Sequence, residues 1–121
     1  MAKCILIVDD DEMVCIALSE LLKPEGYEID SVGSGKEALN QINEKKYDLL
    51  VLDIIMPEMD GLGLCRKIRE REDYSETPII FLTAKSREED RVMGMDAGAN
   101  LFLSKPISPD KLLGLISETI G

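Results

Sequence analysis

Residues 4–12 of the 121-residue chain have the sequence CILIVDDDE, in which five apolar residues run directly into four acidic ones. A short apolar run of this length with β-branched residues is typical of a buried strand. Its apolar positions do not alternate with polar ones, so we expect helices to cover both faces. Residues from about 12 to 23 then carry Val14, Ala17, Leu18 and Leu21 at helical spacing. The stretch therefore predicts a strand and a helix with acids at their junction.

The same alternation is repeated four more times along the chain. Further strands are expected at residues 27–32, 48–52, 78–82 and 101–103, followed by helices that begin near 34–35, after Gly61, at about 87 and around Pro109. On the helix at about 87–97, Val92 and Met95 are the apolar positions, and we expect Met95 in the core and Met93 exposed.

Strands that alternate with helices of this length indicate parallel pairing through right-handed crossovers. We therefore expect residues 1–121 to form one α/β domain. Its fold would be a doubly wound, flavodoxin-like (βα)5 sheet of five parallel strands with helices on both faces. The pattern alone does not fix the strand order, for which we expect 2-1-3-4-5.

Composition excludes several classes of function. Lys and Arg number 14 and Asp and Glu 24, giving a net charge of −10, and there is no histidine. Direct nucleic-acid binding is not expected from so acidic a chain. Hydrolases with a catalytic histidine and zinc sites with imidazole ligands are excluded. The three cysteines, Cys4, Cys15 and Cys65, lack CxxC spacing and are interpreted as reduced, packed thiols. No apolar run approaches a membrane span and no secretion signal leads the chain, so we expect a cytoplasmic location without membrane contact.

Polar residues gather where the expected strands end. Asp9 and Asp10 follow the first strand, Asp53 the third and Thr83 the fourth, and Lys105 comes after the fifth. The second strand, an edge strand in the expected order, ends without a charge. Ligands of open α/β sheets bind beyond the carboxyl ends of the strands, near the switch point in strand order. We therefore expect these five side chains to lie together.

The chemistry of this set favours a metal and a phosphoryl group. Three close carboxylates repel one another unless a cation compensates them, and Mg²⁺ prefers such oxygen ligands. Lys105 can bind phosphate as a point charge, and the Thr83 hydroxyl and Ala84 amide can donate to an anion. Asp53, on the central strand, is placed to act as a nucleophile in phosphoryl transfer.

Each residue also has a plainer interpretation. Acids at the start of a helix cap it, which we prefer for Asp11 and Glu12 and leave open for Asp9 and Asp10. The residues that end the third and fourth strands could be ordinary turn residues, and Lys105 a loop lysine. The combination at four strand ends argues against coincidence.

Four stretches then match a known family in order and spacing: ILIVDDDE at 5–12, DLLVLDIIMPEMDG at 48–61, PIIFLTA at 78–84 and AGANLFLSKP at 97–106. Over essentially its whole length the chain resembles the receiver domain of bacterial response regulators. The resemblance implies that Asp53 accepts a phosphoryl group from the phosphohistidine of a sensor histidine kinase or phosphotransfer protein. It implies that Asp9, Asp10, Asp53 and the carbonyl of Ile55 hold Mg²⁺.

The resemblance also assigns the remaining strand-end residues. Thr83 would move to bind the phosphoryl oxygen, and Lys105 would pair with the phosphoryl group. The peptide bond to Pro106 is often cis in the family. Phe102 stands at the position of the aromatic switch residue, where tyrosine is frequent; a plain core aromatic is the alternative.

The implied function is a phosphorylation-dependent signalling switch, not an enzyme that turns over a metabolite; it would catalyse only its own phosphotransfer and dephosphorylation. The face formed by the fourth helix, fifth strand and fifth helix would change shape and regulate a downstream protein or output domain. Pairing of two phosphorylated copies through that face is a further hypothesis. The chain ends after its last helix, so we expect no output domain in it, whether it stands alone or belongs to a longer regulator.

Three rival interpretations remain. A Mg²⁺-dependent phosphohydrolase would need a substrate cap and a further acid or base. A flavodoxin-like nucleotide or flavin binder would need a glycine- or hydroxyl-rich loop in place of the acids at 9–12. A receiver that is never phosphorylated is disfavoured by the complete set of acids, threonine and lysine.

Overall fold

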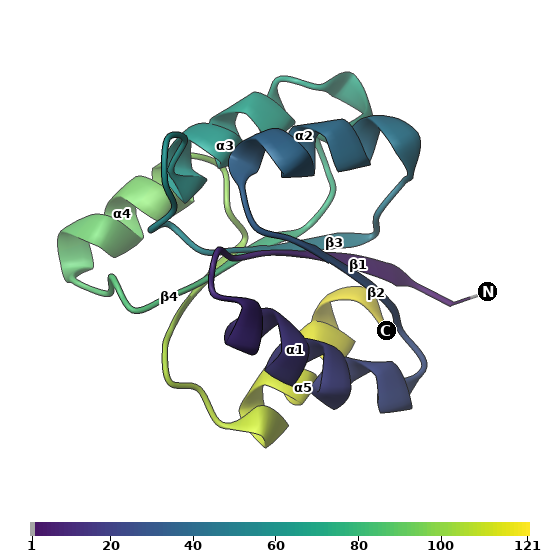
Figure 1. The fold of residues 1–121 in the computed structure, drawn as a ribbon. Helices are drawn as coiled ribbons and strands as arrows, with labels where there is room; N and C mark the ends of the chain where they lie inside the picture. Colours follow the sequence, from purple (N-terminus) through teal and green to yellow (C-terminus); the bar gives the residue numbers. More distant parts are fainter. Residues whose placement is uncertain (1) are drawn as a thin grey trace.

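A computed structural model describes residues 2–121 and shows a central sheet with helices on both sides (Figure 1). The strands are β1 (Cys4–Val8), β2 (Glu28–Val32), β3 (Leu49–Leu52), β4 (Ile79–Thr83) and β5 (Leu101–Ser104). All neighbours pair in parallel, in the order β2-β1-β3-β4-β5. The expected fold class and strand order are therefore confirmed.

The helices form two layers. They are α1 (Glu12–Leu22), α2 (Gly35–Glu44), α3 (Gly61–Arg69), α4 (Glu88–Asp96) and α5 (Pro109–Ile120), with short 3-10 turns η1 (Lys23–Glu25) and η2 (Glu72–Tyr74). Helices α1 and α5 cover one face of the sheet, and α2, α3 and α4 cover the other (Figure 1). Within residues 2–121, no helix combines the length and the apolar character that a bilayer span requires.

Side-chain caps set where most helices begin. Before α1, α2, α3 and α5 a side-chain oxygen accepts a hydrogen bond from a backbone N–H of the first turn; the caps are Asp11, Ser34, Asp60 and Ser108. Each bond satisfies a donor that the helix itself leaves free. The interpretation of Asp11 as a helix cap is confirmed. A cap also fixes the point at which the chain leaves each strand for its helix, and so positions the strand-end residues.

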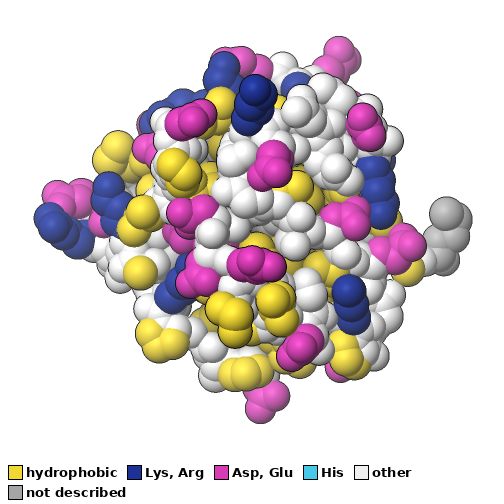
Figure 2. Space-filling model, in the orientation of Figure 1, with side chains coloured by type: hydrophobic (Ala, Val, Ile, Leu, Met, Phe, Trp, Pro, Cys, Tyr) yellow, Lys and Arg dark blue, Asp and Glu magenta, His cyan; other side chains and the backbone are white. Residues whose placement is uncertain are grey.

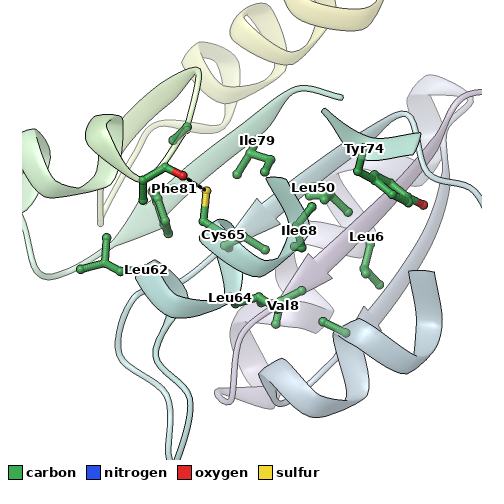
Figure 3. Packing of buried hydrophobic residues seen from close by; sticks show 14 of the residues in the cluster. Leu6, Val8, Leu50, Leu62, Leu64, Cys65, Ile68, Tyr74, Ile79 and Phe81 are labelled. Atoms are coloured by element: carbon green, nitrogen blue, oxygen red, sulfur yellow. Dashed lines mark hydrogen bonds between the residues drawn. The ribbon is translucent and has the colours of Figure 1, made fainter. Parts of the chain in front are cut away.

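Two hydrophobic clusters explain the solid apolar strands. Alternate residues of β1 point to opposite faces, so that Leu6 and Val8 join the cluster under α2 and α3, while Ile5 and Ile7 join the cluster under α1 and α5. Figure 3 shows the first of these clusters, with Leu6, Val8 and the buried Cys65 among its members. Because both faces are covered, a strand without alternation is stable here.

The cysteines are free thiols, and two of the three are packed in the core. The Cys65 thiol lies 3.4 Å from the carbonyl oxygen of Ala97 (Figure 3), and burial raises the pKa of this thiol to about 11. Burial also raises the pKa of Cys15. Cys4 is only partly buried, and its thiol donates to Glu28 at 3.0 Å. The core interpretation is therefore confirmed for Cys15 and Cys65 and holds only in part for Cys4.

Helix α4 departs from the expected orientation. Met95 is 38% exposed, so its assignment to the core was wrong, and Val92 is exposed as well. The buried positions of the helix are Asp90 and Gly94. The reason is space: a Cβ added at Gly94 would lie 2.8 Å from a ring carbon of Phe102. A helix seated this close to an aromatic ring has no room for a large side chain on its inner face.

Candidate functional site

The acidic residues continue the sheet at its carboxyl end. The amide of Asp9 donates to Val32 at 3.1 Å, and that of Asp53 donates to Val8 at 3.0 Å, so the β-type hydrogen bonding extends to both acids. Carboxylate oxygens of Asp9, Asp10 and Asp53 lie within 4.8 Å of one another. Asp9 and Asp53 are buried, whereas Asp10 is exposed. The sheet thus holds two acids rigidly and leaves the third at the surface.

Lys105, which lies 96 positions after Asp9 in the sequence, completes this cluster. Its amide donates to the carbonyl of Thr83 at 2.9 Å, which fixes the backbone beside β4. Its ammonium Nζ lies 2.7 Å from Asp9 Oδ2 and 3.0 Å from Asp53 Oδ2. The following peptide bond, to Pro106, is cis, as the resemblance implied.

Burial and ion pairing oppose each other in this cluster. Burial raises the pKa of Asp9, and hydrogen bonds from Lys105 and from the Asp11 amide only partly offset this. Burial disfavours the ammonium of Lys105, but its bonds to Asp9 and Asp53 outweigh that effect and raise the pKa of the lysine. One ammonium therefore faces a group of three carboxylates, which leaves negative charge to be compensated.

The donor set fits Mg²⁺. Every ligand atom that the three aspartates offer is a hard carboxylate oxygen, and Mg²⁺ is bound by one or two carboxylates together with waters and phosphoryl oxygens. A cation there would relieve the repulsion that Lys105 compensates only in part. The residues present therefore suit the metal that the family implies.

The other expected residues surround the cluster. Thr83 is fully buried at the end of β4, and its hydroxyl accepts a hydrogen bond from the amide of Lys85 at 3.2 Å. Ile55 and Ala84 are exposed at the rim, and the amide of Ile55 donates to Asp53 Oδ1 at 3.2 Å. The structure brings together the three aspartates and the lysine, whereas the threonine hydroxyl is engaged by its own loop.

Phe102 lies on β5 and is partly buried in the layer under α4. Its ring centroid is 6.0 Å from that of Phe81, its partner in the pairing of β4 with β5. A switch residue and a core aromatic can both occupy such a position.

Sequence reasoning missed two residues near the site. The sequence indicates Gly61 only as the residue before a helix, but a Cβ there would lie 2.0 Å from the carbonyl oxygen of Asp53. Its amide also donates to Ile54 at 2.9 Å, so the start of α3 closes directly onto the end of β3. Asp90 is a buried carboxylate at the start of α4. Asp90 lies three residues after Arg87, the residue that precedes α4, and its side chain accepts a hydrogen bond from the Arg87 amide. An acid at this spacing from the start of a helix is the sequence signal for such a capping contact.

The doubly wound sheet gathers three carboxylates and a lysine beyond β1, β3 and β5, an arrangement suited to a divalent cation and a phosphoryl group. The model of the family described as the response regulator receiver domain matches residues 5–117, and the chain belongs to this family. Receiver domains are regulatory domains of two-component signalling, in which phosphorylation controls the response.

Proteins similar in sequence include transcriptional regulators. The chain is 41% identical over 116 residues to the uncharacterized transcriptional regulatory protein YclJ of Bacillus subtilis, covering 96% of this chain and 50% of that protein. It is 39% identical over 109 residues to the alkaline phosphatase synthesis transcriptional regulatory protein PhoP of the same organism, covering 90% and 45%. The chain thus spans about half the length of these relatives.

Solved structures of other proteins share the fold of this chain over nearly its whole length. A putative response regulator from Chloroflexus aurantiacus has a TM-score of 0.94 at 36% identity, with 99% of this chain and 98% of that chain covered. The chemotaxis protein CheY4 of Vibrio cholerae has a TM-score of 0.93 at 30% identity, with 98% and 99% covered.

Proposed function

We propose that residues 1–121 form one receiver domain that acts as a phosphorylation-dependent switch. Asp53 takes a phosphoryl group from the phosphohistidine of a sensor histidine kinase or phosphotransfer protein. The observation that carries this proposal is the buried Asp53 carboxylate, which lies 3.0 Å from the ammonium of Lys105 and within 4.8 Å of carboxylate oxygens of Asp9 and Asp10. A carboxylate nucleophile that lies beside a lysine ammonium and beside further carboxylates suited to a metal is suited to phosphoryl transfer.

Each residue has a role in this reaction. An Asp53 oxygen forms the new bond to phosphorus while the bond from phosphorus to the donor's imidazole nitrogen breaks. Asp9, Asp10, Asp53 and the carbonyl of Ile55 would hold Mg²⁺, which when bound neutralises charge on the phosphoryl oxygens. Lys105 supplies a second positive charge and is already within hydrogen-bond distance of Asp53.

The signal then leaves the site through Thr83. Thr83 moves toward the site, where its hydroxyl and the Ala84 amide donate to the phosphoryl oxygens, and this movement takes the hydroxyl away from the Lys85 amide from which it now accepts. Phe102, the aromatic residue on β5, responds by changing its side-chain rotamer. The face formed by α4, β5 and α5 changes shape and regulates a downstream protein or an output domain.

Intact-protein mass spectrometry tests the proposal. We expect one added phosphoryl group after incubation with acetyl phosphate and Mg²⁺, and no adduct in a chelator or in Asp53→Asn. The variant Asp110→Asn, which makes the same change at an exposed position of α5, should keep the adduct. An unmodified wild-type protein after rapid acid quenching would contradict the proposal. An unchanged gel-filtration volume of the adduct would contradict pairing of phosphorylated copies.

A further inference from the structure

One buried charge is not used by the proposed chemistry. Among residues 2–121, the buried polar or charged side chains are Asp9, Asp53, Thr83 and Asp90. The first three belong to the site. Asp90 is only 7% exposed and lies in the first turn of α4, on the side that faces the sheet. A carboxylate is costly to bury without partners, so its contacts indicate what it holds.

Those contacts connect Asp90 with Thr83. Asp90 Oδ2 accepts a hydrogen bond from the amide of Arg87 at 3.1 Å, and Oδ1 lies 3.9 Å from the ammonium of Lys85. The amide of Lys85 in turn donates to the hydroxyl of Thr83. The loop between β4 and α4 is therefore tied at one end to the threonine and at the other end to the buried carboxylate.

Apolar packing gives α4 little other anchorage. Its inner face offers Gly94 beside Asp90, whereas Val92, Met93 and Met95 are exposed. In Figure 1, α4 lies at the outer end of the layer that it forms with α2 and α3, and Figure 2 shows exposed apolar side chains on that side of the molecule. Because burial of large apolar side chains holds most helices in place, the polar contacts of Asp90 carry a larger share here.

We propose that Asp90 is a positioning residue that holds the loop at 84–87 and the first turn of α4 in the unphosphorylated position. When Thr83 turns toward a phosphoryl group and releases the Lys85 amide, the contacts of Asp90 still tie both Lys85 and Arg87 to the first turn of α4. Their strength sets how readily α4 leaves its resting position. This inference rests on the proposed phosphorylation switch and names the residue that restrains it.

Hydrogen exchange tests the restraint without any phosphorylation. Asp90→Asn keeps the shape of the side chain but removes the charge, which weakens both contacts. In the unphosphorylated protein without Mg²⁺, we expect amides of residues 84–93 to exchange about tenfold faster, while β1 and β3 are unchanged. Asp96→Asn is the matched control, because it makes the same change at an exposed position of the same helix. Equal exchange in the two variants would refute the inference.

The rate of phosphorylation separates positioning from simple helix capping. With acetyl phosphate and Mg²⁺, we expect Asp90→Asn to be modified about threefold or more faster than Asp96→Asn, because the resting position is less favoured. A pure capping role would speed local exchange but leave the two rates equal, which would overturn the inference. A wild-type protein that forms no adduct would refute the proposed function, and with it any role of Asp90 in switching.

Discussion

Replacing Lys105 with methionine tests how far the acidic cluster depends on this ammonium group. Methionine keeps most of the apolar stem and removes the charge. The lysine ammonium lies 2.7 Å from Asp9 Oδ2 and 3.0 Å from Asp53 Oδ2, and these aspartate side chains are 4% and 8% exposed. Without Lys105, two buried carboxylates face each other with no bound metal to separate their charges.

Two estimates bound the free energy of unfolding that Lys105→Met loses. Removing one partner of a buried ion pair typically costs about 3–5 kcal/mol, and the 22% exposure of the Lys105 side chain places this case toward the lower end. A carboxylate can instead take up a proton, which at pH 7 costs at most about 4 kcal/mol from an ordinary aspartate pKa. That ceiling is lower for Asp9, whose pKa burial already raises. We therefore expect the free energy of unfolding to fall by about 2–4 kcal/mol.

Urea unfolding at pH 7 in a chelator measures this loss, with Lys111→Met at an exposed position of α5 as the control. In Lys105→Met the folded state holds a proton more tightly than the unfolded state, so the deficit should shrink as the pH is lowered from 7 toward 5. Mg²⁺ should also restore part of the stability by binding only the folded protein. A loss below about 1 kcal/mol, or one equal to that of Lys111→Met, would refute this account of the cluster.

Two glycine substitutions test the packing around the site. Gly61→Ala places a Cβ 2.0 Å from the Asp53 carbonyl oxygen and should lower the free energy of unfolding, measured in urea, by about 3 kcal/mol or more. The control Gly114→Ala lies in open space on α5 and should raise it by up to about 1 kcal/mol. A similar change in both variants would contradict the prediction. Gly94→Ala brings its Cβ to 2.8 Å from the ring of Phe102 and should cost about 1–2 kcal/mol. Phe102→Leu should recover most of that loss, and additive effects in a double-mutant cycle would show that the two side chains do not meet.

The fold was predictable because its determinants are local in sequence. Apolar runs such as residues 4–8 and 49–52 are too short for helices and too uniform for strands with one exposed face. Covering both faces with helices is the remaining solution, and the right-handed crossover rule then limits the topology. The strand order was an expectation that the pattern left open, because pairing depends on contacts between distant segments.

Much of the site was predictable because a parallel sheet sorts residues by their position along each strand. All five strands point their carboxyl ends the same way, so a residue just past the end of any strand reaches the same edge. Asp53 follows β3 directly and Asp9 follows β1 directly, and their amides are the next donors of the sheet. The position of Lys105 depends less on its strand and more on the reach of its side chain, since it lies just past β5, two strands away from β3.

The orientation of α4 was not predictable from its own residues. Helical spacing favours Val92 and Met95 as an inner face, and a helix judged alone would be placed that way. The space beneath it is set by Phe81 and Phe102, which come from two other segments and leave room for Gly94 but not for a large side chain. The error in sequence reasoning therefore came from packing between elements, which periodicity does not contain.

The acidic cluster and α4 share a physical feature, because each keeps an unfavourable arrangement in the resting protein. The cluster holds three carboxylates against one lysine, and α4 turns its large apolar side chains toward solvent and a carboxylate toward the core. A bound divalent cation would relieve the repulsion among the carboxylates, and a partner that covers the apolar residues of α4 would relieve their exposure to solvent. Thr83 and the loop at 84–87 join the two regions. Under the proposed switch, a change in charge at Asp53 would therefore shift the position of a helix that little apolar packing holds in place.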